Sequence, residues 1–289
     1  MAKNNRLMKI IIIIVFIPIC LISVIPLWTI FVASFTQDKA IADYGYQLWF
    51  KAFSLEAYEY LFVNPDLIVD AYLISIIVTS IGTVLGVFFM SMLAYTMAHR
   101  KFKLAKGLGF YVLIPMLFSS GVVPYYILVT QYLHLKNTIW ILIFPYLINP
   151  FSIMILRSNF RRLPQSLFEA AELDGAGEFQ RFFKIALPLS IPTMATIALF
   201  SAITYWNDMY QALLFIDKQN LYPLPYLLYR MIFEHNIIQE AAQYTGIITP
   251  YQSVRMAVAV LSLIPELFLF MFAQRFFIRG ITLGALKGE

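Results

Sequence analysis

Long apolar runs without charged residues dominate the chain. Five runs contain no Asp, Glu, Lys, Arg or His, and a sixth is interrupted only by Glu266. A helix needs about 20 mostly apolar residues to cross a bilayer, because each residue adds about 1.5 Å of rise. The runs are continuously apolar and do not alternate, so they indicate helices rather than barrel strands. We predict an all-α polytopic membrane protein with six transmembrane helices, at about residues 10–36, 71–98, 107–130, 138–156, 186–206 and 256–277.

The first run follows three basic residues, Lys3, Arg6 and Lys9, as the apolar core of a signal peptide does. It is much longer than such a core, and no cleavage pattern of small residues closes it. We therefore predict that this segment is retained as a membrane span.

Composition agrees with a membrane protein. Of 289 residues, 61% are hydrophobic and only 13% are charged, whereas soluble proteins average about 25% charged residues. This excludes disordered and disulfide-rich secreted classes. Cys20 is the one cysteine and only three histidines occur, so we expect neither a metal site nor a cofactor in this chain.

The placement of the basic residues predicts the orientation. If the six spans alternate, most of the 21 lysines and arginines lie on the side of the N-terminus. Cytoplasmic loops carry this excess, so both termini are predicted to be cytoplasmic and no nucleic-acid partner is needed to explain the net charge of +5. We interpret His99, beside Arg100 and Lys101, as a solvated cytoplasmic charge.

The loops on the two sides differ. On the outside, Ser54–Phe62 and Leu224–Ile232 have helical apolar spacing and predict short helices. On the inside, residues 157–185 separate the fourth and fifth spans. No linker or internal repeat is visible, so we predict a single transmembrane domain over residues 1–289.

The inner loop, residues 157–185, predicts a helix–turn–helix. Pro164 suits a first helical turn, and Ser166 with Glu169 forms a capping-box pattern. The helix should break at Gly175-Ala-Gly177, and a second helix should begin near Glu178 and run into the fifth span. An amphipathic helix that only lies on lipid headgroups is the alternative, although the loop is acidic for that role.

One motif in this loop has a fixed spacing. It consists of Glu169-Ala170-Ala171, Gly175, Ile185 and Leu187-Pro188, with Asp174 before the glycine. This pattern resembles the EAA motif of the inner-membrane permeases of ABC importers. Further segments resemble the maltose-type carbohydrate permeases, so that the resemblance covers nearly the whole chain: Trp206-Asn207-Asp208, Pro265, Gln274–Gly280 and Gly284–Gly288.

The resemblance implies the fold of a type I importer permease, with residues 157–185 as the loop that couples it to an ATPase. In that family the short helix inserts into a cleft of a cytoplasmic ATPase. The implied docking residues are Glu169, Ala170, Ala171, Asp174 and Gly175. The chain has no phosphate-binding loop of the Gly-x4-Gly-Lys-Ser/Thr type. It is therefore expected to be non-catalytic, with ATP and Mg²⁺ bound by a separate ATPase dimer.

The resemblance also implies the remaining partners: a second homologous permease chain, an extracytoplasmic solute-binding protein, a carbohydrate substrate and the lipid of a bacterial plasma membrane. As candidates for the substrate path we name Tyr205, Trp206, Asn207 and Asp208, at the outer end of the fifth span. The two aromatic residues could instead belong to the interfacial belt. The outer loop, residues 208–255, resembles the segment that meets the binding protein, or it caps the channel mouth.

A different class of function stays open at this point. A stand-alone ion-coupled transporter or a polytopic membrane enzyme would place ionisable groups inside the membrane, and Glu266 is such a group. One acid beside Pro265 can equally satisfy freed backbone groups or face a partner chain, and the motif favours that structural role.

Overall fold

A computed structural model describes residues 2–63, 65–99, 102–118, 120–233 and 252–285. Over these residues the regular structure is helical, apart from an isolated antiparallel bridge between Thr36 and Phe53. The chain divides into two compact units, which are described separately. Unit 1 comprises residues 1–68 and 228–265, and unit 2 comprises residues 69–227 and 266–289.

Unit 1 is built around α1 and the start of α14. Its helices are α1 (Ala2–Ser34), α2 (Asp38–Tyr44), α3 (Glu56–Leu61) and the first part of α14 (Gln252–Ala285). The Asp38 carboxylate accepts hydrogen bonds from the backbone N–H groups of Gln252 (2.6 Å) and Ser253 (2.9 Å). It thereby caps α14 from more than 200 residues away, because the first N–H groups of a helix have no partner within the helix.

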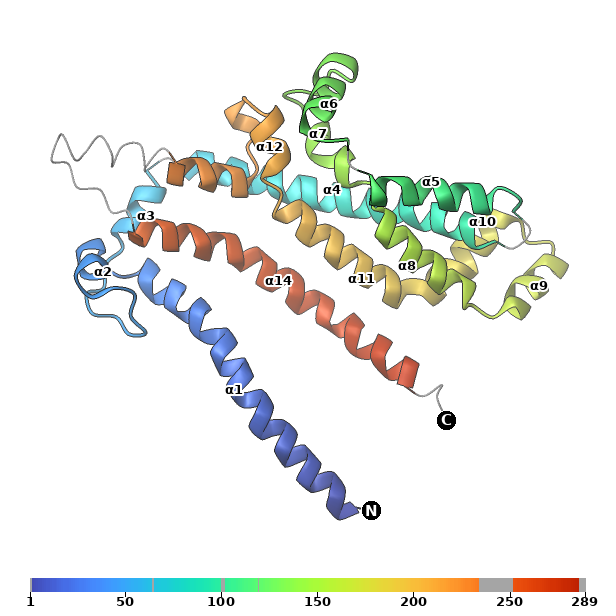
Figure 1. Cartoon of the computed structure of the whole chain (residues 1–289), viewed down its shortest axis with the longest axis horizontal. Helices are drawn as coiled ribbons and strands as arrows, with labels where there is room; N and C mark the ends of the chain where they lie inside the picture. Colours follow the sequence, from blue (N-terminus) through green and yellow to red (C-terminus); the bar gives the residue numbers. More distant parts are fainter. Residues whose placement is uncertain (1, 64, 100–101, 119, 234–251, 286–289) are drawn as a thin grey trace. The chain divides into compact units, whose positions relative to one another are not determined.

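Unit 2 is a helical bundle (Figure 1). It contains most of α4 (Pro65–Ala98), which begins in unit 1, together with α5 (Ala105–Leu117), α8 (Pro150–Arg161) and α11 (Leu187–Trp206). Methionine and branched aliphatic side chains fill its core; Met90, Met97, Ile153, Leu156 and Ile197 are fully buried. The bundle therefore has a packed apolar interior, against which the connecting loops are positioned.

Short elements connect the long helices of unit 2. They are α6 (Val122–Ile127), a π-helical turn (Leu128–Tyr132), α7 (Trp140–Ile143), a 3₁₀ turn (Phe144–Tyr146), α12 (Tyr210–Phe215) and a second 3₁₀ turn (Gln219–Leu221). Residues 224–233 are also helical. Together with α3, this segment confirms the two short helices expected outside the predicted spans.

Among the described residues, four helical segments are each long and apolar enough to cross a membrane: Ile12–Ser34, Pro65–Ala98, Glu178–Trp206 and Gln252–Met271. The predicted third and fourth spans are each divided into a bent pair of helices, so between four and six spans are compatible with the described residues. In the fourth predicted span, the chain bends by 49° between the two helical pieces. The break lies at Asn149, whose backbone is extended before Pro150 and whose side chain accepts the Ser152 N–H. A residue before proline avoids the helical region, so the chain ends one helix and caps the next at this point.

Candidate functional site

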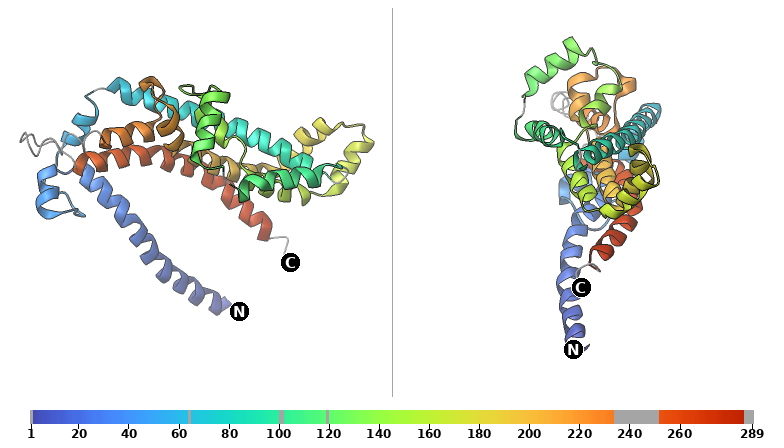
Figure 2. Two further views of the ribbon diagram at one scale, coloured as in Figure 1. Left: turned by 45° about the horizontal axis from the view of Figure 1, so that its top comes forward. Right: turned by 90° about the vertical axis from the view of Figure 1, so that its right-hand side faces the viewer.

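The loop of residues 157–185 forms a helix–turn–helix at one end of the unit 2 bundle (Figures 1 and 2). After α8, the chain forms α9 (Gln165–Leu173), a turn, and α10 (Glu178–Arg181). A π-helical turn, Phe182–Ala186, then continues into α11. The sequence predicted this order, and the second helix runs into the fifth span as expected.

Gly175 makes the turn possible. Its φ of +78° lies in the left-handed region, where a Cβ would clash with the backbone. The turn closes α9 with hydrogen bonds from the Asp174 N–H to the Ala170 carbonyl (3.0 Å) and from the Ala176 N–H to the Ala171 carbonyl (2.8 Å). Gly177 has an ordinary φ of −71°. Of the two glycines in the turn, only Gly175 is required by the backbone conformation.

The start of α9 differs from the prediction. The capping-box hypothesis placed Ser166 before the helix, but the N-cap position is Pro164 and no side chain caps it. The extended backbone of Pro164 (ψ 119°) and the hydrogen bond from the Leu167 N–H to the Pro164 carbonyl begin the helix earlier. Ser166 therefore lies inside the first turn, and the capping box was wrong.

Most of the residues predicted to dock an ATPase lie at the surface of unit 2. Glu169, Ala170, Asp174 and Gly175 are exposed, and Ala171 is half-buried. Beside them are two large apolar side chains, Leu173 and Phe179, which are 89% and 70% exposed. An apolar and acidic surface of this kind suits a protein partner, although docking itself stays a prediction.

Arg181 links the two helices of the loop. Its guanidinium lies 3.2 Å from Glu172 Oε2 and 2.9 Å from Glu178 Oε1. His99 Nε2 lies 3.4 Å from the same Glu178 oxygen, and the His99 side chain is only 27% exposed. The interpretation of His99 as a freely solvated charge was therefore wrong, because the folded loop brings a carboxylate against it.

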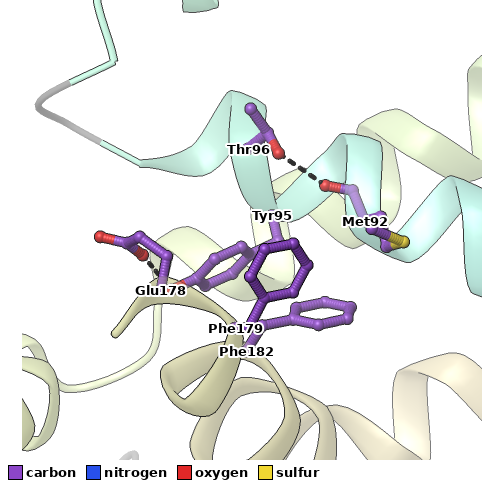
Figure 3. A pocket seen from close by; sticks show the side chains of 6 residues that line it. All are labelled: Met92, Tyr95, Thr96, Glu178, Phe179 and Phe182. Atoms are coloured by element: carbon purple, nitrogen blue, oxygen red, sulfur yellow. Dashed lines mark hydrogen bonds between the residues drawn. The ribbon is translucent and has the colours of Figure 1, made fainter. Parts of the chain in front are cut away.

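Tyr95 joins this loop to α4 (Figure 3). Its hydroxyl donates a hydrogen bond to Glu178 Oε2 (3.1 Å). Its ring centroid lies 5.2 Å from that of Phe182, 5.8 Å from that of Phe160 and 6.4 Å from that of Phe168. One side chain thus contacts α8, α9 and the π-helical turn. We call Tyr95, Glu178, Arg181 and Glu172 the clasp.

A cavity of about 140 Å³ opens beside the clasp. Its lining is mostly apolar and comprises Met92, Tyr95, Thr96, Glu178, Phe179 and Phe182 (Figure 3).

The clasp could not be predicted from the residues along the chain. Tyr95 and Arg181 lie 86 positions apart, and neither belongs to the motif residues. An aromatic residue near the end of a span is typical of an interfacial belt, so only the fold distinguishes Tyr95 from an ordinary belt residue.

The aromatic candidates for a substrate path are buried within unit 2. Tyr205 and Trp206 are each 3% exposed. The Tyr205 hydroxyl donates to the Ile143 carbonyl (2.8 Å), and its ring packs directly against Gly82 of α4. The Trp206 ring centroid lies 6.3 Å from that of Tyr72. Both side chains pack between helices, and their role in a substrate path stays a prediction.

The two polar candidates differ from each other. Asn207 is exposed, whereas Asp208 is 8% exposed. Asp208 Oδ1 accepts hydrogen bonds from the Tyr146 hydroxyl (2.8 Å) and the Tyr210 N–H (3.1 Å). Burial raises the pKa of Asp208, and these hydrogen bonds oppose the rise. Asp208 Oδ2 is buried without a hydrogen-bond partner among the described residues.

Two segments singled out in the sequence extend beyond the described residues. In the loop of residues 208–255, which was expected to meet a binding protein or to cap the channel mouth, residues 234–251 lie outside the described residues. Residues 286–289 of the C-terminal segment that carries the family resemblance also lie outside them.

Apolar helices long enough to cross a bilayer define the class as a polytopic membrane protein, and its unit 2 bundle exposes a helix–turn–helix at one end. Residues 89–283 match the family of binding-protein-dependent transport system inner membrane components. The chain belongs to this family.

Curated relatives and solved structures agree. The polygalacturonan/rhamnogalacturonan transport system permease protein YtcP of Bacillus subtilis is 37% identical over 99% of this chain and 100% of its own length. The trehalose/maltose transport system permease protein MalG of Thermococcus litoralis is 33% identical over 99% of this chain and 100% of its own length. A chain of a bacterial ABC transporter that imports the acidic polysaccharide alginate has a TM-score of 0.80 at 25% identity, covering 95% of this chain and 98% of that chain.

The family decides between the classes of function left open by the sequence. The chain is an inner-membrane permease component of an ABC importer and not an enzyme, because ATP hydrolysis in this family belongs to a separate subunit. The alternatives of a stand-alone ion-coupled transporter and of a membrane enzyme are set aside.

Proposed function

We propose that this chain is one of two permease subunits of an importer that carries a sugar or oligosaccharide delivered by an extracytoplasmic binding protein. The names of the relatives and of the solved transporter support a carbohydrate substrate, since they refer to polygalacturonan/rhamnogalacturonan, trehalose/maltose and alginate transport. We propose a single permease domain with six membrane spans, in which each bent pair of helices counts as one span. We also propose that both termini are cytoplasmic. The distribution of lysine and arginine supports this orientation.

The observation that carries the coupling role is the geometry of α9. A short helix with exposed Glu169 and Ala170 ends at a left-handed Gly175, beside the exposed apolar side chains Leu173 and Phe179. We propose that this surface seats in a cleft of an ATPase subunit, which binds ATP and Mg²⁺. The bound and free states of the ATPase can bias the permease only if they contact this loop differently.

Substrate passage is proposed at the outer end of α11. Asn207 is exposed and can offer an amide to sugar hydroxyl groups. Tyr205, Trp206 and Asp208 are buried behind it and would hold this end of the helix in place. An uncharged polar group facing the substrate suits a sugar, because hydroxyl groups are recognised by neutral donors and acceptors.

The test of the coupling role compares two glycines of one turn. Gly175→Val forces a branched side chain into the left-handed region, at a cost of about 1–2 kcal/mol. Gly177→Val places the same side chain two residues away at an ordinary φ. Beyond the adjacent residues, no described atom lies within 4 Å of a Cβ added at either position, so the two variants differ in local backbone strain and not in overlap with other parts of the chain.

In the transporter reconstituted with its ATPase and binding protein, Gly175→Val should lose binding-protein-stimulated ATPase activity and co-purify less ATPase. Gly177→Val should retain both. Equal stimulation in the two variants and the parent would contradict the docking role of α9.

A further inference from the structure

Residues 44–53, between α2 and α3, fold back along α1 and present aromatic side chains to the surroundings. We propose that this aromatic loop is an interfacial anchor that inserts into the lipid headgroup region of the leaflet in which α1 ends. Its partner is the phospholipid surface, and its role is to fix the depth and rotation of α1.

A hydrogen bond sets the depth of the loop. The Trp28 indole N–H donates to the Leu48 carbonyl over 2.9 Å. Trp28 precedes Ser34, the last residue of α1, by six positions, which corresponds to about 9 Å of helix at 1.5 Å per residue. Side chains of a helix lean toward its N-terminus, so Leu48 lies beside α1 well short of the helix end. Figure 1 shows the chain after α2 returning beside this end of α1.

Backbone hydrogen bonds and ring stacking hold the aromatic loop in its folded-back position beside α1. The Gln37 N–H donates to the Ala52 carbonyl (2.9 Å), and the Ser54 N–H donates to the Phe35 carbonyl (2.9 Å). The Phe35 and Phe53 rings stack at a centroid distance of 5.9 Å. The position of the loop is therefore fixed by contacts at its middle and at its C-terminal end, within unit 1.

The side chains that this arrangement presents are large and apolar. Trp49 is 76% exposed and Phe53 is 65% exposed, and Phe50 is exposed between them. The surface continues onto α1, where none of the most apolar window of the span Ile12–Ser34 is buried. Tryptophan is enriched at the headgroup level of a bilayer, so exposed aromatic side chains held beside an apolar span favour lipid over a soluble partner.

Lys51 provides a positive charge on the aromatic loop, which the proposal places at the boundary between lipid and water. The Lys51 ammonium lies 3.9 Å from the centroid of the Tyr44 ring. The Tyr44 carbonyl accepts a hydrogen bond from Gln47 Nε2 (2.6 Å). A lysine held over an aromatic ring keeps its charge at the interface, where lipid phosphate groups are available.

Spin-label accessibility tests the placement in the full chain. Cys20, the single cysteine, is replaced by serine, and Trp49→Cys then carries a nitroxide label. The chain is purified with partner subunits that lack reactive cysteines, in nanodiscs of phosphatidylethanolamine and phosphatidylglycerol. Collision with oxygen reports lipid, and collision with a water-soluble nickel complex reports solvent.

Two further positions calibrate the measurement. Val24→Cys, on the exposed surface of α1, gives the lipid value, and Glu56→Cys, at the exposed start of α3, gives the water value. The proposal requires the Trp49 position to collide with oxygen and to be largely shielded from nickel, at a depth shallower than that of Val24. Access to nickel equal to that at Glu56 would overturn it, and so would shielding from both reagents, which indicates a covering protein.

A second variant tests the hydrogen bond that sets the depth. Trp28→Phe removes the indole N–H but keeps an aromatic ring next to Phe31, which lies 5.6 Å away. The label at position 49 should then become more mobile and gain access to nickel. An unchanged spectrum and unchanged accessibility would show that the bond to Leu48 does not hold the loop in the interface.

Discussion

The strongest test of the candidate site concerns Tyr95, the residue that fastens the helix–turn–helix to α4. Two substitutions separate its hydroxyl from its ring. Tyr95→Phe deletes the hydrogen bond to Glu178 Oε2 and keeps the ring. Tyr95→Ala also deletes the three ring contacts with Phe160, Phe168 and Phe182.

The expected magnitudes differ. A hydrogen bond to a charged group contributes about 1.5–3 kcal/mol, but the Glu178 side chain is half exposed, so solvent screening reduces the value toward about 1 kcal/mol. That corresponds to roughly a fivefold change in the equilibrium between the attached and the detached loop. Replacing a buried aromatic residue by alanine costs about 3–5 kcal/mol. Because Tyr95 is only half-buried, the lower end of this range applies.

Hydrogen exchange measured by mass spectrometry in the assembled transporter gives the readout. Amides of α9 and α10 should exchange about fivefold faster in Tyr95→Phe, and faster still in Tyr95→Ala, because local opening governs exchange. Binding-protein-stimulated ATPase activity should fall in the same order. A detached loop can still bind the ATPase but cannot move α4.

The matched control is Tyr111, an exposed tyrosine of α5 with no side-chain partner among the described residues. Tyr111→Phe and Tyr111→Ala should leave the exchange of α9 and α10 unchanged. The clasp does not anchor the loop if Tyr95→Ala also leaves the exchange rates of α9 and α10 unchanged. The same conclusion follows if Tyr95→Ala and Tyr111→Ala raise these rates equally.

Two further predictions follow from packing and from charge. Gly82→Ala should destabilise the protein by about 1–3 kcal/mol, because the added Cβ would overlap the Tyr205 ring. Thermal unfolding in detergent should show that Gly82→Ala costs nothing further in a Tyr205→Ala background, and that Gly107→Ala, where the added Cβ meets open space, causes no loss. Hydrogen bonds from Lys136 and Asn137 hold the pKa of Asp217 below its usual value. Their stabilising effect is therefore complete above the ordinary aspartate pKa of about 4 and is lost as the pH falls through the lowered value. The Asp217 amide donates to Asn137 Oδ1 (2.6 Å), and its protection from hydrogen exchange should decline as the pH falls through the lowered pKa. In Asp217→Asn this protection should no longer depend on pH. A decline that persists in Asp217→Asn would contradict the role of the Asp217 carboxylate.

The sequence by itself determined the features that depend on neighbouring residues. Continuous apolar runs require helices in lipid because the backbone has no other hydrogen-bond partner there. The turn after α9 was predictable because one glycine, Gly175, must supply a left-handed conformation within a few residues of the helix. The motif residues around it were found by their resemblance to the EAA motif of a known permease family.

Only the tertiary structure decided which of these local features contact each other. Tyr95, the cap that Asp38 provides for α14, and the bond from Trp28 to Leu48 each join residues that are separated along the chain by between 20 and more than 200 positions. The helix break at Asn149 has a local cause, because Pro150 follows it. The apolar pattern continues across the break, so hydropathy did not predict the bend. Hydropathy and spacing report what each segment prefers, whereas a long-range contact depends on how whole helices pack, as they do around Met90 and Ile153 in the core of unit 2.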